Sequence, residues 1–231
     1  MPRPKISSAL NLRPLKLTVM VGVAGVACAA SAQVTKSGAG YLLRVKYVTG
    51  QVIKLNSLNS IVSTASKGAQ PMQVKMPIVI KVNKADALTA VASVTIGPVS
   101  FADTVLREPE TMDMTIDRQN RAKSKGQAGF VGGELPAQVI KVGQKWSTVA
   151  PMPDPSGAAQ KMVAVYTFGG LKTVNGKSVA VMTYELGGNV KGKGTLLVLA
   201  ADGTIYSNDA TISVNSPTTG PVKVQSKLTR V

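Results

Sequence analysis

Apolar and polar residues alternate along most of the chain after residue 40, and a period of two is typical of β-strands with one buried face. The clearest case is residues 73–83, where five apolar side chains share one face and Gln73, Lys75 and Lys81 lie on the other. A helix would need apolar spacings of three and four. The same alternation predicts further strands at residues 41–47, 52–55, 88–96, 111–117, 160–173, 177–186, 195–200, 204–214 and 221–231.

Turn residues and prolines add detail to this pattern. Asn175-Gly176 and Asp202-Gly203 favour tight hairpins, which imply antiparallel pairing. Pro77 lacks an N–H, so its strand is predicted to lie at an edge or to carry a bulge there. The prolines of residues 151–155 predict an extended loop. The chain is therefore predicted to be all-β, with an antiparallel, strongly curved sheet that forms a half-barrel, an open barrel or a sandwich.

The first thirty-two residues have the features of a secretory signal peptide. Four basic residues and no acidic one precede an apolar run at residues 17–30, and Ala30-Ser31-Ala32 then offers a cleavage site before Gln33. The apolar run is shorter than the roughly 20 residues of a membrane span, although retention as an uncleaved anchor is an alternative. The prediction is an exported protein, periplasmic or extracellular, cut between Ala32 and Gln33.

Cys28 offers a second route, lipid anchoring at that cysteine, but Gly25 stands where lipoprotein signals usually carry a branched apolar residue. Cys28 is the only cysteine and the chain has no histidine. A typical zinc site and Ser-His or Cys-His catalysis are therefore excluded after cleavage. No metal, cofactor or catalytic residue is predicted.

Residues 33–231 are predicted to form a single β-rich domain, long enough to bury about 70% of its unfolded surface. Its parts are an N-terminal strand block at 41–118, a linking segment at 119–158 and a C-terminal strand block at 159–231.

The chain is basic, with 27 Lys and Arg against 11 Asp and Glu. Four basic residues precede Ala32, so 23 remain after cleavage and the formal charge is +12. This excess favours anionic partners, although scattered charge also serves solubility alone. The candidate anion-contacting loop carries Arg118, Arg121, Lys123 and Lys125. No aromatic residue lies among these cations, so nucleic acid is not an expected partner.

Two motifs come close to a known chemistry. Gly187, Gly192 and Lys193 match the spacing of a phosphate-binding loop, but Gly194 replaces the required Ser or Thr and a strand pattern follows instead of a helix. Five acids at residues 103–117 match no calcium loop, and a solvated acidic patch is the favoured interpretation. A weak metal site or a carboxylate-dependent hydrolase remain alternatives.

The stretch 135–146 contains the only tryptophan, Trp146. Pro136 and Gly143 are expected to set the path of the chain, and Trp146 is expected to be a structural anchor whose indole buries apolar area.

Four segments carry a family resemblance: residues 41–51, the Val142-Gly143-Gln144-Lys145-Trp146 segment, residues 174–177 and the stretch from Gly194 to Gly203. With them the chain resembles uncharacterised exported bacterial β-sheet proteins that have a mid-chain Val-Gly-x-x-Trp segment. Gln144 stands where these proteins more usually have an acidic residue. More loosely, the chain is similar to the half-barrel of periplasmic lipoprotein carriers. The resemblance implies no catalytic residue.

These observations favour a non-enzymatic protein of the cell envelope that binds an apolar or amphipathic ligand, such as a lipid, on a curved sheet. The alternative is a structural or adhesive basic protein that binds anionic envelope polymers or lipid headgroups.

Overall fold

The computed structural model describes residues 31–64, 70–101, 104–124, 134–153, 159–188, 190–201, 205–216 and 220–231. The predicted signal peptide lies outside these residues except for Ser31 and Ala32, and Cys28 lies outside them as well. Ala32 and Gln33 belong to the first strand.

The described residues form fifteen strands and no helix. The strands are β1 (Ser31–Ser37), β2 (Gly40–Lys46), β3 (Val52–Ser63), β4 (Met72–Ala85), β5 (Thr89–Ile96), β6 (Val99–Phe101), β7 (Thr104–Arg107), β8 (Glu110–Asp117), β9 (Ala122–Ser124), β10 (Lys145–Pro153), β11 (Ala159–Val174), β12 (Lys177–Gly188), β13 (Val190–Leu199), β14 (Ile205–Ser216) and β15 (Gly220–Arg230). Within these ranges there is no helix that could cross a membrane.

Every strand pair is antiparallel, which confirms the predicted all-β antiparallel class. β1 and β2 form a separate hairpin, and the other thirteen strands form one sheet. Its order is β10-β11-β12-β13-β14-β15-β3-β4-β5-β8-β9, with β6 paired to β4 and β7 paired to β6. The C-terminal meander β10–β15 is joined to the N-terminal block through the pairing of β15 with β3.

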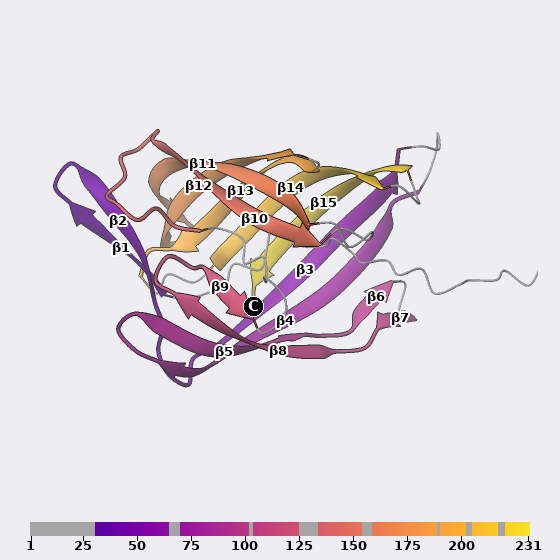
Figure 1. The fold of residues 1–231 in the computed structure, drawn as a ribbon, viewed down its shortest axis with the longest axis horizontal. Coiled ribbons are helices and arrows are strands. Elements are labelled where there is room, and N and C mark those ends of the chain that lie inside the picture. Colours follow the sequence, from indigo (N-terminus) through magenta and orange to yellow (C-terminus); the bar gives the residue numbers. More distant parts are fainter. Residues whose placement is uncertain are drawn as a thin grey trace, which may run out of the picture.

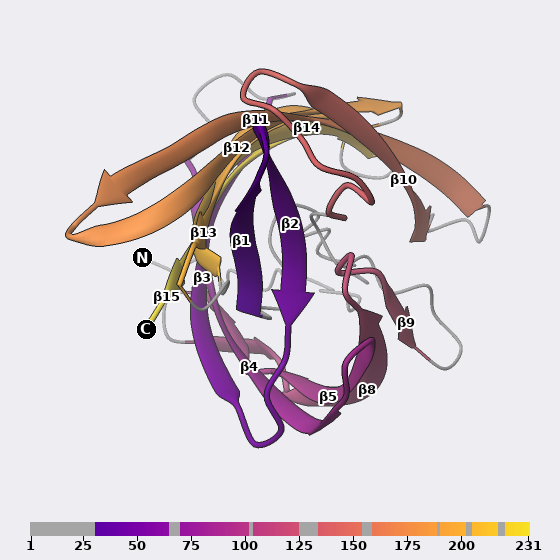
Figure 2. The same ribbon diagram turned by 90° about the vertical axis from the view of Figure 1, so that its left-hand side faces the viewer.

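Alternate side chains of this sheet pack into one large apolar cluster, and the face that carries them is the inner face. The cluster contains Ile78 and Ile80 of β4 as well as Phe168 of β11 and Met182 of β12. In Figures 1 and 2 strands β11–β14 lie on one side of the molecule and β4, β5 and β8 on the other, with β3 and β15 between them. The core therefore lies between two parts of the same sheet.

Two predictions about prolines were wrong. β4 is an internal strand, and its register with β3 is continuous at Pro77. The carbonyl of Pro77 accepts a hydrogen bond from Gly97, so the missing N–H points to the side where β4 changes partner from β5 to β6. A break in pairing on one side thus accommodates the proline.

The prolines at 151 and 153 lie in a strand, β10, instead of the predicted loop. β10 is at an edge of the sheet, where proline is tolerated because one side of the strand needs no donors. The pattern also missed β1, β6, β7 and β9, which are short or lack a clear alternation, and it ended β3 too early.

Candidate functional site

The register of the sheet places one row of inner-face residues across seven strands, from β10 to β3. In order, this row contains Trp146, Tyr166, Tyr184, Gly194, Ala210, Ser226 and Asn59. The row begins with three aromatic rings, passes two small residues and ends with polar side chains. It is the most distinctive chemical feature of the inner face.

The three aromatic rings contact one another in sequence. Trp146 stacks on Tyr166 with ring centroids 5.2 Å apart, and Tyr166 lies 5.5 Å from Tyr184. The indole N–H of Trp146 donates to the carbonyl of Glu134 at 2.8 Å. Trp146 is half-buried and packs against the apolar cluster. The predicted anchor therefore lies at the sheet edge, between the core and the segment that precedes β10.

Tyr184 lies over Gly194 on the neighbouring strand. A Cβ atom at position 194 would come within 2.4 Å of the Tyr184 ring, so only glycine leaves room for it. The Tyr184 hydroxyl donates to Asn208 Oδ1 at 3.1 Å, and both residues are buried. Burial raises the pKa of Tyr184 above its ordinary value, with smaller contributions from Tyr166 and Asp209. The phenol therefore stays neutral and serves as a hydrogen-bond donor inside the core.

A second polar group continues the row on β3 and β15. Ser57, Asn59 and Ser226 are all buried on the inner face. Asn59 Nδ2 donates to Ser57 Oγ at 3.0 Å, but Asn59 Oδ1 has no hydrogen-bond partner within the described part of the chain, although the residue is 0% exposed. A buried amide oxygen without a donor costs free energy, and such a group in a folded protein calls for an explanation.

Methionines are concentrated on the same face. Met76, Met114, Met162 and Met182 are buried in the apolar cluster, and Met72 and Met112 pack against it. Methionine is unbranched and polarisable, and it fills irregular spaces and adapts to different neighbours. The inner face therefore combines an adaptable apolar surface with a narrow polar row.

The segment Glu134–Gln144, called the strap here, connects the two edges of the sheet at one end of the molecule. Leu135 N donates to Gln119 O beside β8, and Gly143 N donates to Phe168 O of β11. Between these points the strap pairs with β2 through Tyr41 and Ile140.

Arg44 of β2 fixes the N-terminal part of the strap. Its guanidinium donates to the carbonyl of buried Pro136 at 2.9 Å and also to the carbonyl of Ala137. At the other end Gly143 has φ +82°, a conformation that favours glycine. The Gln144 side chain accepts the Lys141 N–H at 3.0 Å and so closes the turn before β10. Pro136 and Gly143 thus occupy defined positions in the strap, and an acidic residue at position 144 could accept the same bond.

The four cations of the predicted anion-contacting loop do not share one environment. Arg118 is exposed and borders a depression of about 560 Å³ together with Arg44 and Lys46. Arg121 donates to Asp117 at 2.6 Å in an ion pair. Lys123 lies in β9, where the structure describes only the backbone, and Lys125 lies outside the described residues.

Glu134 lies at the start of the strap, near this ion pair. Burial raises the pKa of Glu134 above its ordinary value, an effect that Arg121 opposes and Asp117 increases.

The other motifs acquire structural roles. Gly192 and Gly194 lie within β13, so they form no phosphate-binding loop. Of the acids at 103–117, Glu110 pairs with Arg107, Asp113 accepts from Ser93 and Asp117 pairs with Arg121. In the part of the chain that the structure describes, no three His, Cys, Asp or Glu side chains lie close enough to hold a metal ion.

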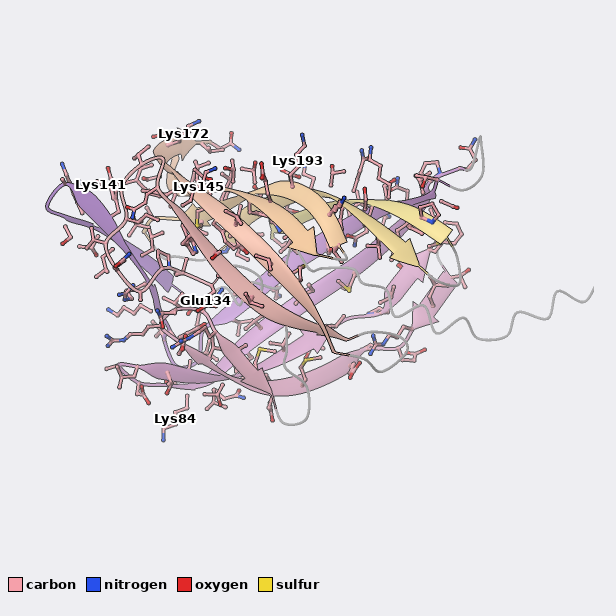
Figure 3. All side chains as sticks on the ribbon, turned by 45° about the horizontal axis from the view of Figure 1, so that its top comes forward. Lys84, Glu134, Lys141, Lys145, Lys172 and Lys193 are labelled. Carbon is pink, nitrogen blue, oxygen red and sulfur yellow. The ribbon has the colours of Figure 1, made fainter. Side chains whose placement is uncertain are left out.

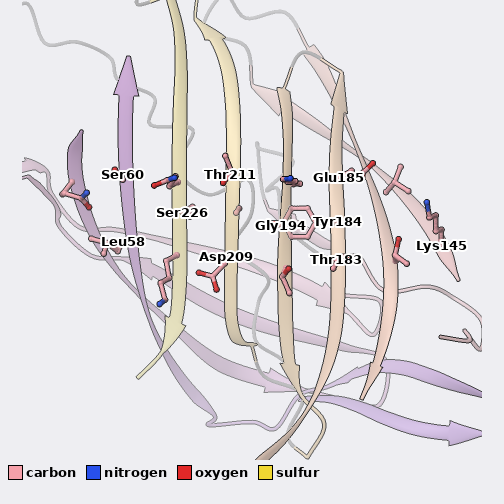
Figure 4. A pocket seen from close by; sticks show the side chains of 18 residues that line it. Leu58, Ser60, Lys145, Thr183, Tyr184, Glu185, Gly194, Asp209, Thr211 and Ser226 are labelled. Atoms are coloured by element: carbon pink, nitrogen blue, oxygen red, sulfur yellow. The ribbon is translucent and has the colours of Figure 1, made fainter. Parts of the chain in front are cut away.

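The opposite side of the sheet, the outer face, is largely polar apart from a small apolar cluster of Val179, Val181 and Leu199. It has a shallow depression of about 670 Å³ that extends across β10–β15, β3 and β4 (Figure 4). Its lining includes the hydroxyls of Thr167, Thr183 and Thr211 and the charged side chains of Lys193 and Asp209.

The polar residues of the inner row were missed by the sequence pattern. The predicted strand ends at Leu55, and four of the five residues at 56–60 are polar. Among them, Ser57 and Asn59 keep the parity of inward-facing Ile53 and Leu55. Extending the alternation by two steps would have found them.

No family model matches this chain, and no curated protein matches it.

Proposed function

We propose that this protein is an exported, non-enzymatic envelope protein that binds an amphipathic ligand on the inner face of a strongly curved, half-barrel-like sheet. The ligand would be apolar over most of its length, as a lipid is, and would carry one hydrogen-bond donor. The observation that carries this proposal is the amide oxygen of Asn59, which has no partner among the described residues, in a largely apolar, methionine-rich interior.

The chemistry of the inner face supports this ligand class. An apolar chain between the two parts of the sheet would replace contacts that the methionines now make within the apolar cluster, and these side chains can repack at low cost. A hydroxyl or amide of the ligand would satisfy Asn59 and so recover the cost of its unmade bond. The strap closes one end of this interior, so the ligand would enter from elsewhere.

Asn59→Leu tests the proposal because leucine has a similar volume and no polar atom. Without ligand, the free energy of unfolding should rise by about 1–2 kcal/mol, since an unsatisfied buried amide is removed. Affinity for a long-chain fatty alcohol, measured by displacement of a fluorescent acyl probe, should fall by about threefold to tenfold. Affinity for an alkane of equal length should not fall.

Asn56→Leu is the matched control, because Asn56 is exposed on the outer face of the same strand. It should leave the affinity for the fatty alcohol unchanged.

Mass spectrometry of molecules extracted from protein purified from its native envelope should identify an amphipathic species at near-stoichiometric amount. Absence of such a species together with failure to bind the acyl probe would reject the proposal.

A further inference from the structure

Four lysines form a cluster on the outer face of β13–β15. Lys191 and Lys193 lie two residues apart on β13, and Lys223 and Lys227 lie on β15. All four are exposed. On the strand between them, β14, Ser213 lies directly between Lys191 and Lys223, whereas Thr211 separates Lys193 from Gln225. Figure 3 shows Lys193 projecting from this side of the molecule, opposite to Lys84.

The spacing of this lysine cluster suits repeated anionic groups. β13 and β15 are separated by two strand intervals, or about 10 Å, and alternate residues along a strand are about 7 Å apart. Strands hold the Cα atoms at these spacings, while the long side chains adjust. Several ammonium groups can therefore contact carboxylates or sulfates on successive units of a polymer.

The cluster has more positive than negative charge. Two acids accompany it, Asp209 opposite Lys227 and Glu185 opposite Lys193. Among the described residues the ion pairs join Arg107 to Glu110 and Arg121 to Asp117, so none of the four lysines takes part in one. Their ammonium groups can therefore contact an external anion.

The outer-face depression runs directly past the cluster. Lys193 and Lys227 line it, as do Thr211 of the intervening strand β14 and Gln225 of β15. These hydroxyl and amide groups can donate to and accept from the hydroxyls of sugar units. The depression has a volume of about 670 Å³, which accommodates several ring atoms of a sugar chain that lies across the strands.

The surroundings favour a polysaccharide over a membrane or a nucleic acid. Of the exposed large apolar side chains in the described ranges, only Leu58 borders this region, and stable membrane attachment uses a larger apolar surface. The aromatic ring at the depression, Tyr184, is 4% exposed and bonds inward to Asn208, so it offers no stacking platform for bases.

From this arrangement we infer that the outer face of β13–β15 binds a linear acidic polysaccharide. The lysine cluster contacts its carboxylate or sulfate groups, and the depression holds its sugar units. This site is on the opposite face from the proposed ligand site and does not depend on it.

The test uses the full chain after removal of residues 1–32, with heparin and polygalacturonate as sulfated and carboxylated probes and dextran as the neutral one. In affinity electrophoresis at low salt, the wild type should be retarded by both acidic polymers and not by dextran. Affinity should fall steeply with salt, since counterions are released on binding. Changing all four clustered lysines to glutamine should weaken binding at least about tenfold, as expected when several counterion-releasing contacts are lost.

A matched control removes equal charge elsewhere, by changing Lys36, Lys84, Lys141 and Lys172 to glutamine; all four are exposed and lie outside the cluster. Compared at an ionic strength of about 0.1 M, it should change affinity less than about twofold, because charges beyond a Debye length of about 10 Å are screened. Equal weakening of both variants would show a net-charge effect and overturn the proposal. So would absence of retardation at low salt, or tighter lysine-dependent binding to phosphatidylglycerol vesicles or single-stranded DNA. Circular dichroism melting of both variants confirms that they are folded.

Discussion

Gly194 shows how a single residue organises the interior of this protein. Its missing side chain leaves the space into which Tyr184 extends toward Asn208. The tyrosine in turn contacts Tyr166, which stacks on Trp146 at the sheet edge. One glycine therefore sets the position of an aromatic row that extends across three strands.

Gly194→Ala is expected to destabilise the fold by about 2–3 kcal/mol, because the new Cβ forces the Tyr184 ring and its hydrogen bond to shift. Gly187→Ala is the control, since a Cβ there meets only the Val163 carbonyl at 4.0 Å. It should change stability little. Urea denaturation followed by Trp146 fluorescence measures both. Equal effects would mean that loss of backbone freedom, and not the tyrosine, explains the result.

Glu134 should make stability depend on pH. Its raised pKa means that the folded state keeps the carboxyl proton to higher pH than the unfolded chain does. The free energy of unfolding should therefore fall as pH rises from the unfolded pKa through the folded one. Glu134→Gln should remove this slope, so that the variant is more stable than wild type above that range and equal below it.

Denaturant titrations from acidic to neutral pH measure this effect. The variant retains the backbone carbonyl that Trp146 bonds, so a structural loss is not expected. Glu108→Gln, an exposed position, is the control. Parallel curves for wild type and Glu134→Gln would contradict the prediction.

Among the elements, β10 lies at one end of the sheet order, with no partner beyond it among the described strands. Phe168 N donates to Gln144 O, so the backbone groups of Gln144 point toward β11. Along the register of β10 with β11, this direction alternates from one residue to the next. By this alternation the N atoms of Pro151 and Pro153 point to the open edge. Proline there removes donors that a second chain could use for pairing.

Changing Pro151 and Pro153 together to threonine should increase self-association with little loss of stability. The new N–H groups lie on the open edge and break no bond to β11. Light scattering at rising protein concentration measures association, and thermal melting measures stability. Ser147→Thr on the same strand adds a threonine without a new donor and should not associate. If the variant loses stability without associating, the N atoms of these prolines face β11 and not the open edge, and the prediction is wrong.

At the scale of the whole molecule, the sequence predicted the strands that alternate strictly and the hairpins with Gly-containing turns. The alternation predicted β4, β5, β8 and β12–β15, because one face of each of these strands is buried. It did not predict which strands would meet. The pairing of β15 with β3 leaves no local signal, because its partners are far apart in the chain.

The candidate site was predicted only in part, for the same reason. Trp146, Pro136 and Gly143 were identified as architectural residues, but the Tyr184–Asn208 bond and the lysine cluster depend on register between strands. Asn208 of β14 reaches Tyr184 of β12 across β13, because Gly194 leaves space there. Lys191 lies near Lys223 because only one strand, β14, stands between their strands. Such juxtapositions follow from pairing and not from spacing along the sequence.

The pairing of β15 with β3 also has a kinetic consequence. Val222 lies opposite Ser63, so this contact closes the longest loop among the strand pairs of the sheet. Each meander can form from neighbouring hairpins, but the union of the two must wait for this slow, entropically costly encounter. Until then, two long strands would present unpaired backbone to other molecules. The half-assembled chain, more than the finished fold, is therefore the form in which a chaperone or an aggregate could capture this protein.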